Sequence, residues 1–462
     1  MNDYDHPIIA RVNRKQEKIS QRGEETRIRW WQLALIGISS VIGAGFFLGS
    51  SVSLRAAGAS VLLGYFVSGL AALTVFSALA EMTVNDPQLG SFRTYAREAY
   101  GQGFAFVFGW IYWFAGLLIV SSEVTALATF ARYWFPRVPL WLFCVLFAAS
   151  GMGIVLSGVK NFGTVESFFA IIKTSALLAF FFFTAFLFFQ HHVDSSIAMH
   201  SPLHEQFFAN GYSGLWRSLI FTLLSFGGIE IIGLTANRCR SDKDVLRAGF
   251  STIVTLIVIY VVTIASVLAL THLSQIHASQ SPFVTALDQM HLPYIDSLFN
   301  LIILTAAFST MIGALYSMTT ILATLADDGD APRFLSKGRS QQRRCLGVTF
   351  FLMLILISSS YFLPKTVYEY LASAAGTMLI LNWLAILLSD WKNRQHYRGR
   401  HWRFTYQPLA IILGLAIIVF SICGALLDAE QRVSILLSIG LLAALTMVYN
   451  LQRKWRGTRG KK

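Results

Sequence analysis

Hydrophobic residues along this chain occur in long runs, and a short polar or charged stretch separates each run from the next. An α-helix of about 20 apolar residues crosses the hydrocarbon core of a bilayer. Counting runs of this length predicts an all-α membrane protein with twelve transmembrane helices. The predicted helices start near Trp31, Ala59, Phe104, Leu140, Phe162, Leu215, Phe250, Tyr294, Gly347, Val367, Pro408 and Val433.

The first run, from Trp31 to Leu54, contains glycine where a helix is weakened by it. Gly43, Ala44 and Gly45 lie at its midpoint, and each glycine in a helix interior costs about 1 kcal/mol relative to alanine. Inside a bilayer, an interrupted backbone is stable only where protein or a water-filled cavity satisfies the freed N–H and C=O groups. The run therefore predicts a broken helix at a binding site.

The sixth run has the same feature, with Phe226, Gly227 and Gly228 at its centre and Glu230 directly after them. Two broken helices five runs apart are typical of an inverted repeat, in which runs one to five and six to ten are structural copies of opposite orientation. The predicted order is an N-tail, a first repeat, a second repeat, helices eleven and twelve, and a basic C-tail. These parts cover residues 1–29, 30–190, 191–390, 391–452 and 453–462.

Composition supports a membrane protein, since 55% of the 462 residues are hydrophobic and only 13% are charged. The net charge of +13 raises the question of a nucleic-acid partner. With the N-terminus inside, however, about 30 of the 37 Lys and Arg residues fall on the inner side, as the positive-inside rule requires. The charge therefore reports topology: we expect a multi-pass protein of the cytoplasmic membrane, with both termini in the cytoplasm and no nucleic-acid partner.

The two breaks suggest a ligand by their electrostatics. A broken helix exposes N–H groups at the start of one half and C=O groups at the end of the other, so it binds an anion and a cation side by side. A zwitterionic α-amino acid has this pattern. We expect its carboxylate at the amides from Gly43 to Phe46, and its ammonium at the carbonyls of Ile42 and of Phe226 to Gly228. The alternative is that these glycines only allow close helix packing.

Three ionisable residues lie within the predicted spans, namely Glu123, Lys173 and Glu230. An isolated charge at mid-membrane costs several kcal/mol, so pairing or proton exchange is expected. Lys173 is a candidate to take up and release a proton; alternatively, it stays charged and is held by carbonyls of the first broken helix. Glu230 is a candidate to contact substrate, relay a proton or satisfy freed amides, and the sequence does not separate these roles.

Motifs for catalysis and for cofactors are missing from the sequence. No P-loop pattern, Ser/His/Asp set or metal-ligand cluster occurs, so we expect neither an enzyme nor a bound cofactor, and a proton gradient is the expected driving force. The cysteines have no paired spacing and indicate neither a disulfide framework nor a zinc site. They are Cys144, Cys239, Cys345 and Cys423.

Several stretches together resemble the amino acid/polyamine/organocation superfamily, and within it the bacterial amino acid permeases, over nearly the whole chain. They are IGAGFFLGS in the first run, SEVTALATFARYWFPRVPLW after the third, SFGGIE in the sixth, and the stretch from SPFV through NLIILTAAFS to LADDGDAPRF. The resemblance implies the leucine-transporter-type fold, with substrate at the unwound centres of helices one and six. It also implies alternating access by rocking of the two repeats.

The resemblance also assigns roles to single residues. In similar proton-coupled permeases, a lysine in helix five lies where sodium-coupled relatives bind sodium, and Lys173 is at the matching position. Ser309 and Thr310 match the helix-eight hydroxyls beside that place. Glu230 matches the acidic residue that ends the helix-six motif. Two positions depart from the family pattern. Leu224 lies where some exchangers have an aromatic gate, and Asn237 lies after helix six, where many relatives have an acidic residue. These departures leave symport and exchange both open.

These observations predict a secondary active transporter that imports an amino acid with protons. Neutral or hydrophobic substrates fit better than basic ones, because Glu230 is the only evident acidic group by the site. An amino acid exchanger and an amino-acid-binding membrane sensor that moves nothing are the alternatives. Metal-ion transport would require Asp, Asn or Met ligands at the breaks, and the first break has none.

Overall fold

The computed structural model describes residues 29–85, 92–157, 162–189, 207–235, 241–290, 294–336, 338, 340–363, 366–394 and 406–459. Within these ranges every regular element is a helix, which agrees with the predicted all-α class. The N-tail up to residue 28, the end of the C-tail from residue 460, Asn237 and Cys239 lie outside the described residues.

The first half of the chain begins with a helix in three pieces and continues with long apolar helices. Its elements are α2 (Trp30–Val41), α3 (Ala44–Phe47), α4 (Gly49–Ala57), η1 (Gly58–Ser60), α5 (Val61–Asn85), α6 (Phe92–Tyr100), α7 (Gln102–Ala131), α8 (Leu140–Ser157) and α9 (Phe162–Phe189).

The second half again begins with an interrupted helix, α12 (Gly211–Leu224) and α13 (Glu230–Thr235). The remaining elements are α14 (Asp242–Leu270), η3 (Leu273–Gln275), α15 (Pro282–Asp288), α16 (Ile295–Asp327), η4 (Arg333–Leu335), α17 (Gln341–Phe362), α18 (Val367–Asn393), α19 (Gln407–Ala425) and α20 (Ala429–Arg459). The two interruptions thus fall where the glycines predict them.

Ten stretches in the described part of the chain are long and apolar enough to cross a membrane. The first of them, Ala44–Asn85, joins α3, α4 and α5, and the shorter apolar helix Trp30–Val41 precedes it. The exact number of twelve crossings and the division into two repeats stay predictions.

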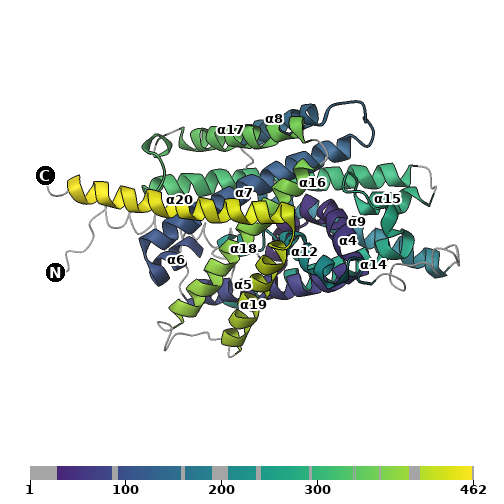
Figure 1. The fold of residues 1–462 in the computed structure, drawn as a ribbon, viewed down its shortest axis with the longest axis horizontal. Coiled ribbons are helices and arrows are strands. Elements are labelled where there is room, and N and C mark those ends of the chain that lie inside the picture. The colour runs from purple at the N-terminus through teal and green to yellow at the C-terminus, as the bar shows by residue number, and fades with distance from the viewer. Residues whose placement is uncertain are drawn as a thin grey trace, which may run out of the picture.

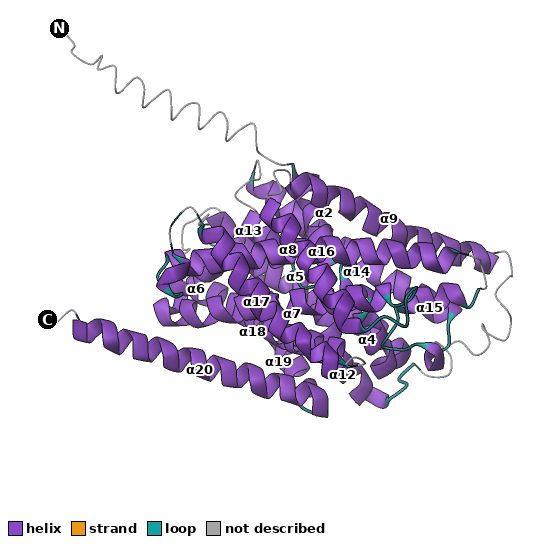
Figure 2. Ribbon diagram, turned by 90° about the horizontal axis from the view of Figure 1, so that it is seen from above, coloured by secondary structure: helices purple, strands orange, loops and turns teal. Residues whose placement is uncertain are grey.

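The long helix α7 lies at the centre of the bundle and packs most extensively against α16 and α18. Figure 1 shows α7 beside α16, with α8 and α17 together along one side of the molecule. In Figure 2, α9 and α20 lie at opposite edges of the bundle. The core formed in this way holds both helix interruptions near α7, α16 and α18.

Candidate functional site

The first break is a short extended segment between two helices. Ile42 and Gly43 have extended backbone angles, with φ values of −73° and −145°, and they separate the end of α2 from the start of α3. The C=O groups at the end of α2 and the N–H groups at the start of α3 therefore lack helical partners. Each needs a hydrogen bond from elsewhere, since the segment is buried.

Glu123 of α7 satisfies the start of α3. Its carboxylate accepts hydrogen bonds from the Ala44 amide at 2.9 Å and 3.1 Å, and the side chain is buried. A carboxylate is the group that the N-terminus of a helix favours. The protein's own acid thus occupies an amide at which the sequence led us to expect the carboxylate of a substrate.

Lys173 of α9 satisfies the end of α2. Its ammonium, fully buried, donates to the Ser39 carbonyl at 2.9 Å and to the Thr310 hydroxyl at 2.7 Å. Thr310 of α16 in turn donates to the Ile42 carbonyl at 3.0 Å or to the Ala306 carbonyl at 3.1 Å. A cation near carbonyls at a helix C-terminus is the favourable counterpart of the acid at the next N-terminus.

Two contacts at the first break were not anticipated from sequence. The Tyr368 hydroxyl of α18 donates to the Ala44 carbonyl at 2.8 Å, and the Ser225 hydroxyl donates to the Gly45 carbonyl at 2.9 Å. Both partners are more than 150 positions away along the chain, so no local pattern indicates them. Ser225 also joins the two breaks directly, because it begins the turn after α12.

The second break is a turn over residues 225–229 that depends on its own residues. Gly228 has φ +103°, a region that L side chains rarely adopt. Its amide donates to the Glu230 carboxylate at 3.2 Å, so Glu230 satisfies a freed amide, one of the three roles considered for it. Tyr260 of α14 donates to the Ser225 carbonyl at 3.0 Å.

Two carbonyls of this turn stay available. Among the residues that the structure describes, none donates a hydrogen bond to the carbonyl oxygen of Phe226 or Gly227. The turn lies against the first break, because a Cβ added at Gly228 would lie 2.8 Å from the Ser40 carbonyl oxygen. These carbonyls therefore suit a cation that binds between the two breaks.

Apolar and aromatic side chains surround the two breaks. Phe46 stacks on Tyr260 with ring centroids 3.9 Å apart, and Phe283 of α15 packs against Phe46 at 5.4 Å. Leucine side chains lie beside two of the glycines: a Cβ built on Gly45 would lie 3.8 Å from Cγ of Leu224, and one built on Gly227 would lie 2.9 Å from Cδ2 of Leu379. Aromatic and leucine side chains, together with the Leu224 carbonyl oxygen at 3.5 Å from the Gly45 position, thus pack around the two breaks.

The structure brings most of the predicted site residues together. The backbone of residues 42–46, the turn at 226–228, and the side chains of Glu123, Lys173, Glu230 and Thr310 surround one buried region. Ser309 is buried, but its hydroxyl has no hydrogen-bond partner among the described residues. Side chains with opposite charge hold one interrupted helix, and this arrangement suits binding of a zwitterion and movement of a proton.

The fold and the paired breaks define the class of this protein as a membrane transporter of the leucine-transporter type. Solved structures of a manganese transporter from Eremococcus coleocola match it with a TM-score of 0.58. The match covers 92% of this chain and 94% of that one at 12% sequence identity. A likeness at this identity concerns the fold alone.

The chain belongs to the amino acid permease family, whose sequence profile matches residues 32–457. It is 36% identical over 433 residues to the uncharacterized transporter YcgH of Bacillus subtilis, covering 93% of this chain and 96% of the relative. It is also 30% identical over 385 residues to the aromatic amino acid transport protein AroP of Escherichia coli, covering 81% and 84%. The predicted family is confirmed, and the protein is a multi-pass membrane protein for amino acid transport.

Proposed function

We propose that this permease imports a neutral amino acid with an apolar side chain, together with a proton, across the bacterial cytoplasmic membrane. Both termini are in the cytoplasm in this proposal, as the distribution of Lys and Arg favours. The observation that carries the coupling is the pair of opposite charges, Glu123 and Lys173, bonded to the two helix ends of the first break.

The substrate ammonium binds at the carbonyls of Phe226 and Gly227, which have no hydrogen-bond donor in the described structure. The substrate carboxylate binds at the start of α3, where Glu123 now accepts from Ala44. Its side chain lies toward Leu224 and Leu379, which favour hydrocarbon over charge. The aromatic amino acids named for the AroP relative fit this description.

Coupling follows from the crowding of negative charge at the start of α3. A substrate carboxylate near Glu123 places two like charges in a buried site, and one proton relieves their repulsion. Lys173 is the second group in the site that is able to exchange a proton, and its ammonium holds the end of α2 while it is charged. Glu230 and Thr310 complete the proposed set of coupling residues, with Thr310 in contact with both Lys173 and the break. Ser309 is left out of this set, because its hydroxyl has no partner among the described residues.

A screen of the twenty amino acids tests the substrate assignment. Stabilisation of the purified protein against thermal unfolding is expected for phenylalanine, leucine and related neutral amino acids, but not for lysine or glutamate. Counterflow in liposomes loaded with the stabilising amino acid then tests transport. Stabilisation without flux or counterflow would instead identify a sensor, and flux only against internal amino acid would identify an exchanger.

A further inference from the structure

A cavity of about 740 Å³ lies far from the two breaks, where α7, the end of α16 and α20 meet. Its size is within the range of small-molecule sites, about 300–1,000 Å³. Two helical stripes face each other across it: Phe106, Trp110 and Phe114 at intervals of four on α7, and Leu445, Val448 and Gln452 on α20. Tyr449 of α20 packs against Phe106 of α7 with ring centroids 5.5 Å apart. The two helices are therefore in contact at one edge of the cavity.

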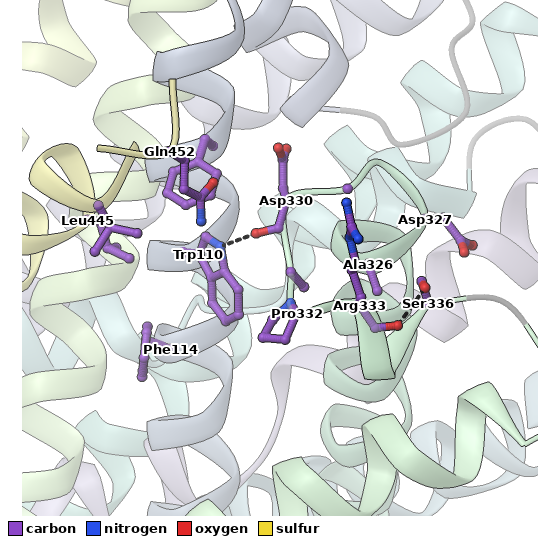
Figure 3. Close-up of a pocket in the computed structure, with 14 residues that line it drawn as sticks. Trp110, Phe114, Ala326, Asp327, Asp330, Pro332, Arg333, Ser336, Leu445 and Gln452 are labelled. Atoms are coloured by element: carbon purple, nitrogen blue, oxygen red, sulfur yellow. Dashed lines mark hydrogen bonds between the residues drawn. The ribbon is translucent and has the colours of Figure 1, made fainter. Parts of the chain in front are cut away.

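The polar groups of this cavity gather at one end. In Figure 3, the Asp330 carboxylate, the Gln452 amide and the Arg333 guanidinium lie in the upper part of the view, with Phe114 and Pro332 below them. The loop is fixed there, because Trp110 donates to the Asp330 carbonyl at 3.1 Å and the Asp330 carboxylate pairs with Arg93. The cavity is therefore amphipathic, with a fixed polar end.

Two exposed residues of opposite charge line this cavity. Arg333 is exposed, and its guanidinium makes no hydrogen bond or ion pair with any residue in the described part of the chain. Asp327, also exposed, accepts only the neutral Gln341 amide, at 2.9 Å, in that part of the chain. A ligand with one phosphate and one primary ammonium complements this pair, because guanidinium binds phosphate and carboxylate binds ammonium.

The α20 wall of the cavity borders the outside of the bundle. Figure 2 shows α20 at an edge of the bundle, and Val448, which lines the cavity, is 43% exposed. In a membrane protein such a side chain faces lipid. We propose that this cavity is a binding site for one phosphatidylethanolamine molecule, with the phosphate at Arg333, the ammonium at Asp327 and an acyl chain between α7 and α20.

Native mass spectrometry of the purified full-length protein tests the site, with phosphatidylethanolamine, phosphatidylcholine and phosphatidylglycerol of the same acyl chains. We expect phosphatidylethanolamine to bind about tenfold more tightly than either of the others, the effect of one charge-assisted hydrogen bond. Phosphatidylcholine lacks N–H donors, and phosphatidylglycerol lacks the cation. Equal retention of the three lipids would overturn the proposal.

Variants test the contributions of the two charges and of the apolar cavity wall separately. Arg333→Gln is expected to weaken phosphatidylethanolamine and phosphatidylglycerol alike by about tenfold, whereas Asp327→Asn removes only the preference between them. Leu445→Trp is expected to fill the space between α7 and α20 and to abolish retention of all three lipids. Leu437→Trp on the same helix, at a position 65% exposed and outside the cavity, is the matched control and leaves binding unchanged. Wild-type retention in both Arg333→Gln and Leu445→Trp would refute the site.

Discussion

The two breaks differ in where their supporting groups come from. At the first, side chains of α7, α9, α16 and α18 bond to the backbone between Ser39 and Ala44. At the second, the turn depends on the positive φ of Gly228 and on Glu230, two residues further along the same chain segment. Distant charged side chains thus hold the first break, whereas the second depends mainly on its own residues, with one neutral hydroxyl, that of Tyr260, bonded to it from α14.

This comparison predicts the largest effect for Gly228→Ala. Alanine at φ +103° is strained, and its Cβ would lie 2.8 Å from the Ser40 carbonyl oxygen, a backbone atom that has little freedom to move. We expect a loss of about 2 kcal/mol or more in stability and nearly complete loss of uptake. Thermal unfolding of the purified protein measures the loss of stability. Gly153→Ala is the control, because no atom lies within 4 Å of the added Cβ. Equal melting temperatures of the two variants would show that the second turn tolerates a side chain.

Gly43→Ala is expected to act next most strongly, and through neighbouring side chains. The backbone at φ −145° accepts alanine, but the added Cβ would lie 2.5 Å from Glu123 Oε1 and 2.9 Å from Thr310 Cγ2. Displacement of Glu123 from Ala44 removes a charge-assisted hydrogen bond, so initial uptake in proteoliposomes should fall about 10- to 100-fold. Gly347→Ala on α17 is the control, since no atom lies within 4 Å of the added Cβ. Similar uptake by both variants would contradict a role for this contact.

The smallest effects separate two adjacent hydroxyls on α16. Thr310→Val removes the hydroxyl between Lys173 and the first break, and uptake should fall about tenfold. Ser309→Ala removes a buried hydroxyl without a described partner, so uptake and stability should change little. Initial uptake rates of the two variants provide the test. A larger effect at Ser309 would reverse the assignment of the coupling hydroxyl.

The sequence predicted the positions of both breaks, because glycines within apolar runs conflict with a continuous helix in a bilayer. It also selected Glu123, Lys173 and Glu230, since a charge within a span has few structural explanations. Two of their contacts are among the alternatives that the sequence left open, namely Lys173 at a carbonyl of the first broken helix and Glu230 at a freed amide. The contact of Glu123 was not predictable. Glu123 meets Ala44 across 79 positions, and Tyr368 meets it across 324.

Residues outside the breaks illustrate the same limit. Hydroxyls such as those of Ser225 and Tyr368 are common in membrane helices, and periodicity does not distinguish one that bonds to a distant backbone from one that bonds to its own helix. The sequence also did not indicate that the protein's own acid occupies an amide of the first break. Helix rotation and three-dimensional packing decide these contacts.

Direct measurement of proton movement with substrate tests the central claim, that the charges at the first break couple transport to protons. Proteoliposomes with an internal pH indicator and a labelled neutral amino acid report both fluxes. For the wild type we expect the interior to become more acidic as the amino acid enters, and we expect faster uptake when the interior is alkaline. For Lys173→Ala we expect both effects to be lost. Uptake that proceeds without acidification in the wild type and is unchanged in Lys173→Ala would contradict the account.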